Sequence, residues 1–486
     1  MRCSVWGSRV TADPSFNTEP TQKAKRLAWL GVLPILAGML WLMQSFEMGA
    51  LAFILLLPVT GGLLATGAAH FLWPGDLRIH QSMALCGSLG VIISIPLYFY
   101  FGLFEGAWLT ASAFVSILCA GACAVDEEPL YPGVPHPDLT PPLAAIVAVD
   151  EVVLGFEQFA IQIPQGQKAE DLVGEVFEGL EFFEDHGWLD EPLGYHEIPP
   201  PLPLPTLTPR RAANMAYEHL SFESLYEPRP EEPGRARWQS FVANRTGHAY
   251  VIRHPEEQRP WIICCNGYRS GNPNLDLRLF RRYHQELGLN VLIPVLPLHG
   301  PRRIGRLSGE GFLSSQIMDS VHAEAQAIWD MRRLTDWIRS QGPPSVGALG
   351  LSLGGYTTAL FASIEPTLAC AIAGIPVADF GRLFWRHGPR RGIARLENLS
   401  LNEALVSRLL QPVSPLKLDP LVPARNRMIF GGTVDRLVSP DQVQDLAAHW
   451  GHPRTVWYEG GHMTFGLDDR VQAGIDATLR DAQVRA

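Results

Sequence analysis

The pattern of hydrophobic and polar positions divides the chain into two parts. Residues 27–125 hold only four charged side chains, Glu47, Asp76, Arg78 and Glu105. The apolar stretches between them are as long as a helix needs to cross the hydrocarbon core of a membrane, about 20 residues. This pattern predicts four membrane spans over residues 27–46, 48–73, 83–104 and 106–125. A three-span or re-entrant arrangement is the alternative.

Basic residues beside the predicted spans indicate their orientation. Lys23, Lys25 and Arg26 precede the first span, Arg78 lies between the second and third, and the other two loops carry only acidic residues. Lysine and arginine accumulate on the cytoplasmic side of membrane proteins. We therefore expect an integral protein of a bacterial inner or plasma membrane, with a disordered cytoplasmic tail over residues 1–26 and its large C-terminal part also in the cytoplasm.

Residues 126–221 are predicted to connect the membrane region to a second domain. The segments 129–142 and 199–209 contain six prolines each, which is typical of semi-rigid linkers. Between them, residues 167–188 place Leu172, Val176 and Leu180 at helical spacing among many acidic residues. This indicates an acidic amphipathic helix packed on the next domain, with a partner-binding helix as the alternative.

From about residue 222 to 486, strand-like and helix-like patterns alternate. Helical patterns cover residues 275–287, 320–340, 354–364 and 441–450, and an antiparallel hairpin is predicted from 238–244 and 249–254. The other strand-like runs cover 261–265, 291–296, 346–351, 369–375, 428–430 and 455–458. Such alternation predicts an α/β fold with a mostly parallel, doubly wound sheet. Reactive groups in these sheets gather at the carboxyl ends of the strands.

Overall charge and cysteine usage exclude some classes of function. The chain has 39 basic and 49 acidic residues, a net charge of −10, so it has no overall basic field for nucleic acid. Its seven cysteines include no C-x-x-C pair and fit small buried hydrophobic residues. Cys119 and Cys123 lie one helical turn apart, but no histidine or carboxylate is adjacent to either. We therefore expect no metal site there.

A candidate nucleophile follows the strand-like run at 346–351. Residues 350–354 read Gly-Leu-Ser-Leu-Gly and a helical pattern follows directly. In a G-x-S-x-G turn the glycines avoid clashes while the strained serine exposes its hydroxyl. The pattern itself is short, but the flanking strand and helix favour Ser352 as a nucleophile over an inert serine in a glycine-rich turn.

A serine nucleophile needs a base, and the base needs an orienting carboxylate. Asp435 follows the predicted strand at 428–430, and His462 follows the one at 455–458. The order Ser352, Asp435, His462 places each residue after its own strand. Weaker candidates are Asp441 and Asp419 for the acid and His299 and His322 for the base, and His299 is also a candidate pocket residue.

Backbone N–H groups are expected to stabilise the oxyanion that forms when a serine attacks a carbonyl. One is the amide of Leu353, directly after the nucleophile. The other is expected from the loop after the strand at 261–265, with Tyr268 favoured over Gly267.

With these three positions in place, residues 222–480 resemble an α/β-hydrolase of the branch of esterases, lipases and acyl peptidases. One departure is Asn266-Gly267 where many members have His-Gly, which affects the side-chain hydrogen bonding of this loop and makes Asn266 a candidate pocket residue. The resemblance implies ester, thioester or amide cleavage through an acyl-serine, without metal or organic cofactor. Residues 377–427 match the place where the family inserts a cap, with Trp385 as a candidate pocket residue.

The sequence thus predicts a membrane-anchored serine hydrolase acting on an ester, small or lipophilic, at a bilayer. Acyl transfer on the same triad is one alternative. A membrane scaffold or transport module with a degenerate hydrolase domain is the other. Ionisable residues inside the spans would favour transport, but only His70 and His80 are present, both near span ends. Substrate identity and oligomeric state are not predicted.

Overall fold

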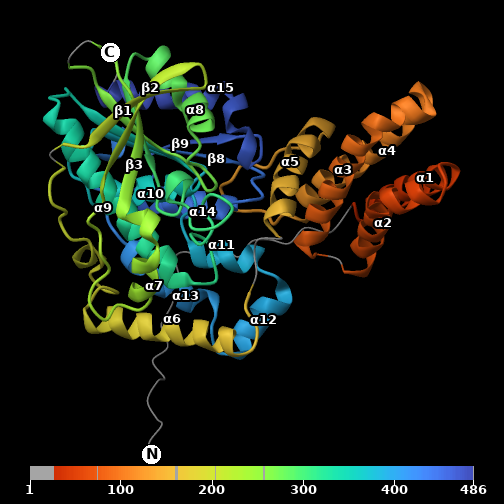
Figure 1. Ribbon diagram of the computed structural model, residues 1–486, viewed down its shortest axis with the longest axis horizontal. Coiled ribbons are helices and arrows are strands. Elements are labelled where there is room, and N and C mark those ends of the chain that lie inside the picture. The colour runs from red at the N-terminus through yellow and green to blue at the C-terminus, as the bar shows by residue number, and fades with distance from the viewer. Residues whose placement is uncertain (1–26, 74, 159–162, 203, 256–257, 485–486) are drawn as a thin grey trace, which may run out of the picture.

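The computed structural model describes residues 27–73, 75–158, 163–202, 204–255 and 258–484. Four helices, α1 (Val32–Glu47), α2 (Ala50–Leu72), α3 (Leu77–Phe101) and α4 (Leu103–Glu127), form a bundle beside the rest of the chain (Figure 1). The structure has four helices long and apolar enough to cross a membrane, as predicted. The predicted tail over residues 1–26 lies outside the described residues.

The third of these helices begins earlier than the predicted start at residue 83. The Asp76 side chain caps α3 by accepting the N–H of Arg78 (3.2 Å) and also binds the Arg78 guanidinium (2.8 Å). The cap and this local ion pair allow helix to form across residues that the charge pattern assigned to a loop. Large side chains on the outer faces of the bundle are exposed, among them Leu51, Ile54, Ile92, Phe99 and Leu103.

Helix α5 (Pro141–Glu157) begins at the last two residues of the predicted linker 129–142 and continues through residues for which no helix was predicted. Thr140 caps it by accepting the N–H of Leu143 (3.3 Å), and its prolines lie in the first turn, where proline costs no hydrogen bond. A Cβ at Gly121 of α4 would clash with the carbonyl of Ala144, so the two helices touch backbone to backbone. The helix lies between the bundle and the second domain (Figure 1). Proline content therefore misled the prediction because it marked a helix start.

The second domain is built on one nine-stranded sheet with the order β1-β2-β3-β5-β4-β6-β7-β8-β9. The strands β1 to β3 and the pair β3–β5 are antiparallel, and all other neighbours are parallel. Their bounds are β1 (Thr206–Ala212), β2 (Met215–Glu223), β3 (Thr246–Ile252), β4 (Trp261–Cys265), β5 (Asn290–Val295), β6 (Val346–Leu351), β7 (Cys370–Gly374), β8 (Arg427–Gly432) and β9 (Arg454–Tyr458). This is the predicted α/β-hydrolase fold.

The antiparallel edge of the sheet differs from the prediction. Strand β3 pairs with β2 rather than with residues 238–244, which form α7 (Arg235–Ser240) and a 3-10 turn over Val242–Arg245. The sheet begins at Thr206, before the predicted boundary at 222. Strand β1 is an edge strand and largely polar, so it accommodates Pro209 and shows no hydrophobic alternation. A short apolar run such as 238–244 does not distinguish helix from strand by itself.

Helices cover both faces of the sheet. Helices α8 (Pro273–Gln285) and α15 (Asp469–Asp481) pack into one core with alternate strand residues such as Ile262 and Cys264. The other core contains α9 (Ile317–Ser340), α10 (Leu353–Phe361), α14 (Pro440–His449) and the opposite strand residues such as Ile263. Helix α6 (Gln167–Asp185) buries Leu172, Val176 and Phe183 in this core, which confirms the predicted packed helix.

Three short helices fill the segment between β7 and β8, where the cap was predicted. They are α11 (Phe380–His387), α12 (Arg390–Asn398) and α13 (Glu403–Leu409). Leu396, Val406 and Leu409 are buried in the core that also contains α6, so the cap is packed firmly against the domain.

Candidate active site

Ser352 stands in a sharp turn between β6 and α10. Its backbone has φ 57° and ψ −118°, a strained conformation for a residue with a side chain, and its N–H donates to the carbonyl of Gly374 (2.9 Å). A Cβ at Gly350 would clash with the carbonyl of Gly354, and one at Gly354 with the carbonyl of Cys265. The two glycines of the motif are therefore required by close backbone packing around the serine.

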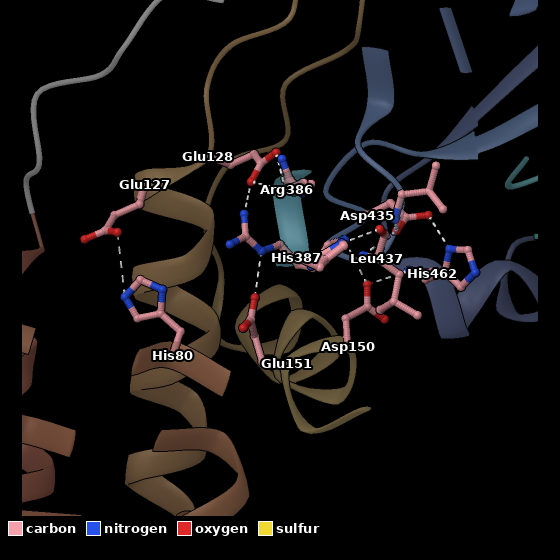
Figure 2. Close-up of polar contacts among 12 residues, drawn as sticks. His80, Glu127, Glu128, Asp150, Glu151, Arg386, His387, Asp435, Leu437 and His462 are labelled. Carbon is pink, nitrogen blue, oxygen red and sulfur yellow. Dashed lines mark hydrogen bonds and ion pairs between the residues drawn. The ribbon is translucent and has the colours of Figure 1, made fainter. Parts of the chain in front are cut away.

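Asp435 and His462 lie side by side at the ends of β8 and β9. The imidazole Nδ1 of His462 is 2.7 Å from Oδ2 of Asp435, and both side chains are almost fully buried (Figure 2). The other oxygen of Asp435, Oδ1, accepts the N–H groups of Leu437 and Val438 (2.9 Å each). Burial alone would lower the pKa of His462, but the charge and hydrogen bond of Asp435 raise it above its ordinary value. The pair can accept a proton on the free imidazole nitrogen.

An apolar cavity of about 980 Å³ connects the serine to the cap. Ser352 and Leu353 form part of its wall, as do Leu437 and Val438, which directly follow Asp435 in the chain. Among the described residues, no hydrogen bond joins Ser352 to His462. The structure thus brings Asp435 and His462 into contact and places Ser352 on the cavity wall. Other apolar lining residues are Leu154, Leu313, Val377, Phe380, Leu383, Phe384, Val406 and Leu410.

The loop after β4 lies directly against the serine. A Cβ at Gly267 would be 3.2 Å from the Cβ of Ser352, and Tyr268 lines the same cavity. The amide N–H of Gly267 is already used, because it donates to Oδ1 of its neighbour Asn266 (2.8 Å). This geometry favours the amides of Tyr268 and Leu353 as the oxyanion donors.

The side chain of Asn266 stabilises the conformation of this loop. Asn266 is not among the residues lining the cavity. Its Nδ2 donates to Oδ1 of Asp276 (2.7 Å), while Oδ2 of Asp276 accepts the N–H of Gly271 (2.9 Å). Burial raises the pKa of Asp276 to about 6. The asparagine that replaces the more common histidine therefore fixes the loop from within.

The weaker candidates for base and acid are engaged elsewhere. Nδ1 of His299 lies 2.8 Å from the carbonyl of Pro297, and burial lowers the pKa of this histidine to about 4. Its ring lies behind Tyr268, with the centroids 6.0 Å apart, rather than on the cavity wall. His322 contacts the carbonyl of Pro233 (2.9 Å). Asp441 binds Arg382 (2.7 Å) and Asp419 is exposed.

The cap contributes different residues to the cavity than predicted. Phe384 lines it, whereas the indole N–H of Trp385 donates to Glu397 (3.2 Å) and Trp385 is not a lining residue. His387 also lines the cavity and contacts the carbonyl of Leu437 with Nε2 (2.8 Å). Burial lowers the pKa of His387 to about 4, so it is neutral at physiological pH.

Helix α5 supplies a carboxylate that sequence reasoning missed. Asp150 is fully buried and accepts the backbone N–H groups of His462 (2.6 Å), Met463 (3.2 Å) and Arg436 (3.2 Å) (Figure 2). A Cβ at Gly461 would clash with this carboxylate, which explains the glycine before the histidine. Burial and the nearby charge of Asp435 raise the pKa of Asp150. One side chain therefore holds both loops that carry the Asp435–His462 pair.

The next residue of α5 belongs to a buried ionic network. Oε1 of Glu151 accepts Nε of Arg436 (2.7 Å), and Arg436 also pairs with Glu128 at the end of α4. Glu128 in turn pairs with Arg386 of α11 (2.9 Å). Burial lowers the pKa of Arg436 to about 10, so it stays protonated at neutral pH. The network joins the bundle, α5, the cap and the loop of Asp435.

A third acidic residue of α5 reaches the cavity itself. Glu157 binds the guanidinium of Arg269 (2.8 and 3.0 Å), and both residues line the cavity together with Leu154. The available signal for these roles was the adjacent pair Asp150 and Glu151 within the otherwise apolar stretch 141–156. A buried acidic pair in such a stretch needs partners from elsewhere in the fold.

Removing the Asp150 carboxylate should loosen both loops. Asp150→Ala leaves three buried N–H groups without an acceptor, so we expect the free energy of unfolding in detergent to fall by about 2–5 kcal/mol. Asp150→Asn keeps one acceptor but removes a charge that raises the pKa of His462, so that pKa should fall. Thermal unfolding and histidine NMR titration measure the two effects. Asp138→Ala, at an exposed aspartate, is the matched control. An unchanged His462 pKa in Asp150→Asn would contradict this role.

The chain aligns with several solved structures and with two proteins of known sequence. No protein-family model matches the chain. Acetyl xylan esterase 1 from Thermoanaerobacterium sp. JW/SL YS485 is 16% identical and aligns over 60% of this chain and 93% of its own, with a TM-score of 0.44. An acetyl xylan esterase from Paenibacillus sp. R4 is 14% identical over 63% and 94% of the two chains, with a TM-score of 0.44.

Two proteins of Mycobacterium tuberculosis are closer in sequence. They are Uncharacterized protein MT2702 of strain CDC 1551 / Oshkosh and Uncharacterized protein Rv2627c of strain H37Rv. Each aligns over 345 residues, which is 70% of this chain and 82% of the relative. With 43% identity over that length, the chain belongs to the same family as these two mycobacterial proteins.

Proposed function

We propose that the protein is a membrane-anchored serine hydrolase that cleaves a lipophilic ester through an acyl-serine intermediate. The strained backbone of Ser352 on the wall of an apolar cavity is the observation that carries this proposal. Strain of this kind persists where the surrounding structure enforces it, and it projects the hydroxyl away from the sheet. The hydrogen-bonded pair of Asp435 and His462 supplies the base that a serine nucleophile needs to lose its proton.

The proposed reaction proceeds in two half-reactions. His462 takes the hydroxyl proton as the oxygen of Ser352 bonds to the ester carbonyl carbon, and the oxyanion accepts the N–H groups of Leu353 and Tyr268. Collapse of the tetrahedral adduct breaks the bond to the alcohol, which leaves with a proton from His462. Water then adds to the acyl-serine by the same route and releases the acid. Asp435 orients the imidazole and stabilises its charged form.

The lining of the cavity supports an apolar acyl group as the substrate's main binding element. Apolar side chains from α5, the cap and the loop after Asp435 line one part of a volume of about 980 Å³. Charged residues also line it, namely Glu157, Arg237, Arg269, Arg306, Glu310 and Asp319. Burial of apolar surface contributes about 25 cal/mol per Å² to the free energy of binding. Such a cavity therefore favours substrates with long apolar acyl chains over esters of small polar acids.

The arrangement of the bundle supports a cytoplasmic position of the catalytic domain. His70 near the end of α2 lies beside His80 near the start of α3, and Leu27 binds Asp126 (2.9 Å). The chain therefore enters and leaves the bundle at one end, beside α5. That end also carries Arg78 and follows the basic residues 23, 25 and 26. Lysine and arginine favour the cytoplasmic side.

The nucleophile can be tested without knowing the substrate. A fluorophosphonate probe should label the full chain in detergent. Ser352→Ala should abolish labelling because, in the described part of the chain, Ser352 is the only serine on the cavity wall with a left-handed backbone. Ser315→Ala, at another serine on the cavity wall, should leave labelling unchanged. If the folded native protein is not labelled, the proposal is wrong, and the alternative of a non-catalytic membrane scaffold with a degenerate hydrolase domain is favoured.

The pH dependence of labelling should identify the acid of the triad. Only the neutral imidazole accepts the serine proton, so the rate should rise with pH through the raised pKa of His462, with its midpoint above about pH 6.5. Asp435→Asn removes the charge that raises this pKa, so the midpoint should move down and the rate should fall by about 10³–10⁴-fold. Asp441→Asn is the matched control. A midpoint that shifts in Asp441→Asn instead would reassign the acid.

The cap should set the preference for acyl chain length. Phe384→Ala enlarges the cavity, so we expect kcat/KM to shift toward longer p-nitrophenyl esters and vesicle-borne lipid esters by about tenfold. Trp385→Ala removes a neighbouring aromatic residue that does not line the cavity, and its preference should match the native protein. Equal turnover of both variants on every ester would contradict a cap that contacts the acyl chain. Product analysis with added alcohols distinguishes hydrolysis from acyl transfer.

A further inference from the structure

Three side chains with metal-binding atoms meet inside the bundle, at the end beside α5. His70 comes from the last turn of α2, His80 from the first turns of α3 and Cys123 from the last turns of α4. Their residue exposures are only 4%, 1% and 1%. Residues 53 positions apart in the chain are thus placed in contact by the packing of three helices.

The separations of these atoms suit a single ion. One ligand atom from each residue lies within 4.8 Å of the other two. Sγ of Cys123 is 3.8 Å from Nε2 of His70, and the two imidazole centroids are 5.5 Å apart. In a tetrahedral zinc site, neighbouring ligand atoms lie about 3.4–3.6 Å apart. The separations of 3.8 Å and of up to 4.8 Å are longer than these distances, so the proposal requires the three side chains to move closer together around the ion.

A carboxylate stands next to the cluster. Oε2 of Glu127, in the last turn of α4, is 3.9 Å from Nε2 of His80 (Figure 2). The side chain of Glu127 is 7% exposed. Two imidazoles and a thiolate are donor types that zinc accepts, and the Glu127 carboxylate lies against one of the imidazoles rather than within the three-residue group.

We propose that His70, His80 and Cys123 bind a zinc ion, with the Glu127 carboxylate beside His80. The charge balance supports this assignment, because a divalent cation bound by one thiolate, with one carboxylate beside it, forms a neutral buried unit. An uncharged cluster avoids the cost of placing isolated charges in an apolar bundle. The thiol loses its proton on binding, so the site should release metal as the pH falls.

The expected role of the ion is structural. It would join α2, α3 and α4 at the end of the bundle that contacts α5. Glu127 is followed directly by Glu128, which pairs with Arg386 and Arg436 of the catalytic domain. A fixed end of α4 therefore positions the ionic network that holds the loop of Asp435. This inference does not depend on the proposed hydrolase activity.

Metal analysis of the full chain tests the proposal directly. We expect the protein, purified in detergent without chelators, to contain about one zinc per chain by inductively coupled plasma mass spectrometry. Cys123→Ala and His80→Ala should lower the zinc content by about tenfold or more. Cys119→Ala is the matched control, since Cys119 is a buried cysteine one turn earlier on α4 and is outside the cluster. Zinc that survives in Cys123→Ala would overturn the proposal.

A spectroscopic measurement on the native sequence covers the case in which a variant does not fold. After chelation and exchange with cobalt, a thiolate ligand produces a sulfur-to-cobalt charge-transfer band, and a tetrahedral site produces intense visible d–d bands. We expect both, and we expect added zinc to remove them. If the folded native chain shows no charge-transfer band and binds no zinc, the cluster is a hydrogen-bonded polar contact and the proposal fails. A different transition metal at equal stoichiometry would overturn the assignment to zinc.

Discussion

The carboxylate of Asp150 is the interaction on which the candidate active site most depends. It accepts the N–H groups of His462, Met463 and Arg436, and thereby holds the ends of two neighbouring strands in one geometry. The side chains of Asp435 and His462, which these two backbone segments carry, lie 2.7 Å apart. The carboxylate comes from α5, which is packed on the membrane bundle and lies outside the α/β-hydrolase domain in the chain.

The ionic network beside Asp150 shows how charge is kept in this buried interface. Glu128 and Glu151 face Arg386 and Arg436, so the four side chains sum to zero charge. Removal of one member would leave an uncompensated charge, which typically costs about 3–5 kcal/mol. Because each member comes from a different element, the network makes the bundle, α5, the cap and the loop of Asp435 interdependent. The four-helix bundle is therefore joined to the α/β domain by specific buried ion pairs.

The same interface links the two sites inferred for this chain. Adjacent glutamates at the end of α4 face in different directions, Glu127 toward the His70–His80–Cys123 cluster and Glu128 toward Arg386 and Arg436. The cavity wall also includes Leu154 and Glu157 of α5. A substrate entering this cavity would thus contact a helix whose other side rests on the bundle. That position is suited to an ester delivered from a membrane surface.

Local pattern was sufficient to predict much of the molecule. The charge-free stretches indicated four spans because a membrane requires long apolar helices, and the glycines around Ser352 indicated a strained turn because only glycine fits there. The strand pattern also indicated that Ser352, Asp435 and His462 each follow a strand of their own, and these strands are β6, β8 and β9. Only the tertiary structure decided the rest. The polar edge strand β1 and helix α5 had no distinctive hydrophobic pattern. Asp150 and His462, like His70 and Cys123, are far apart in the sequence and come into contact only through the packing of helices. The spacing of residues along the chain contains no information about such contacts.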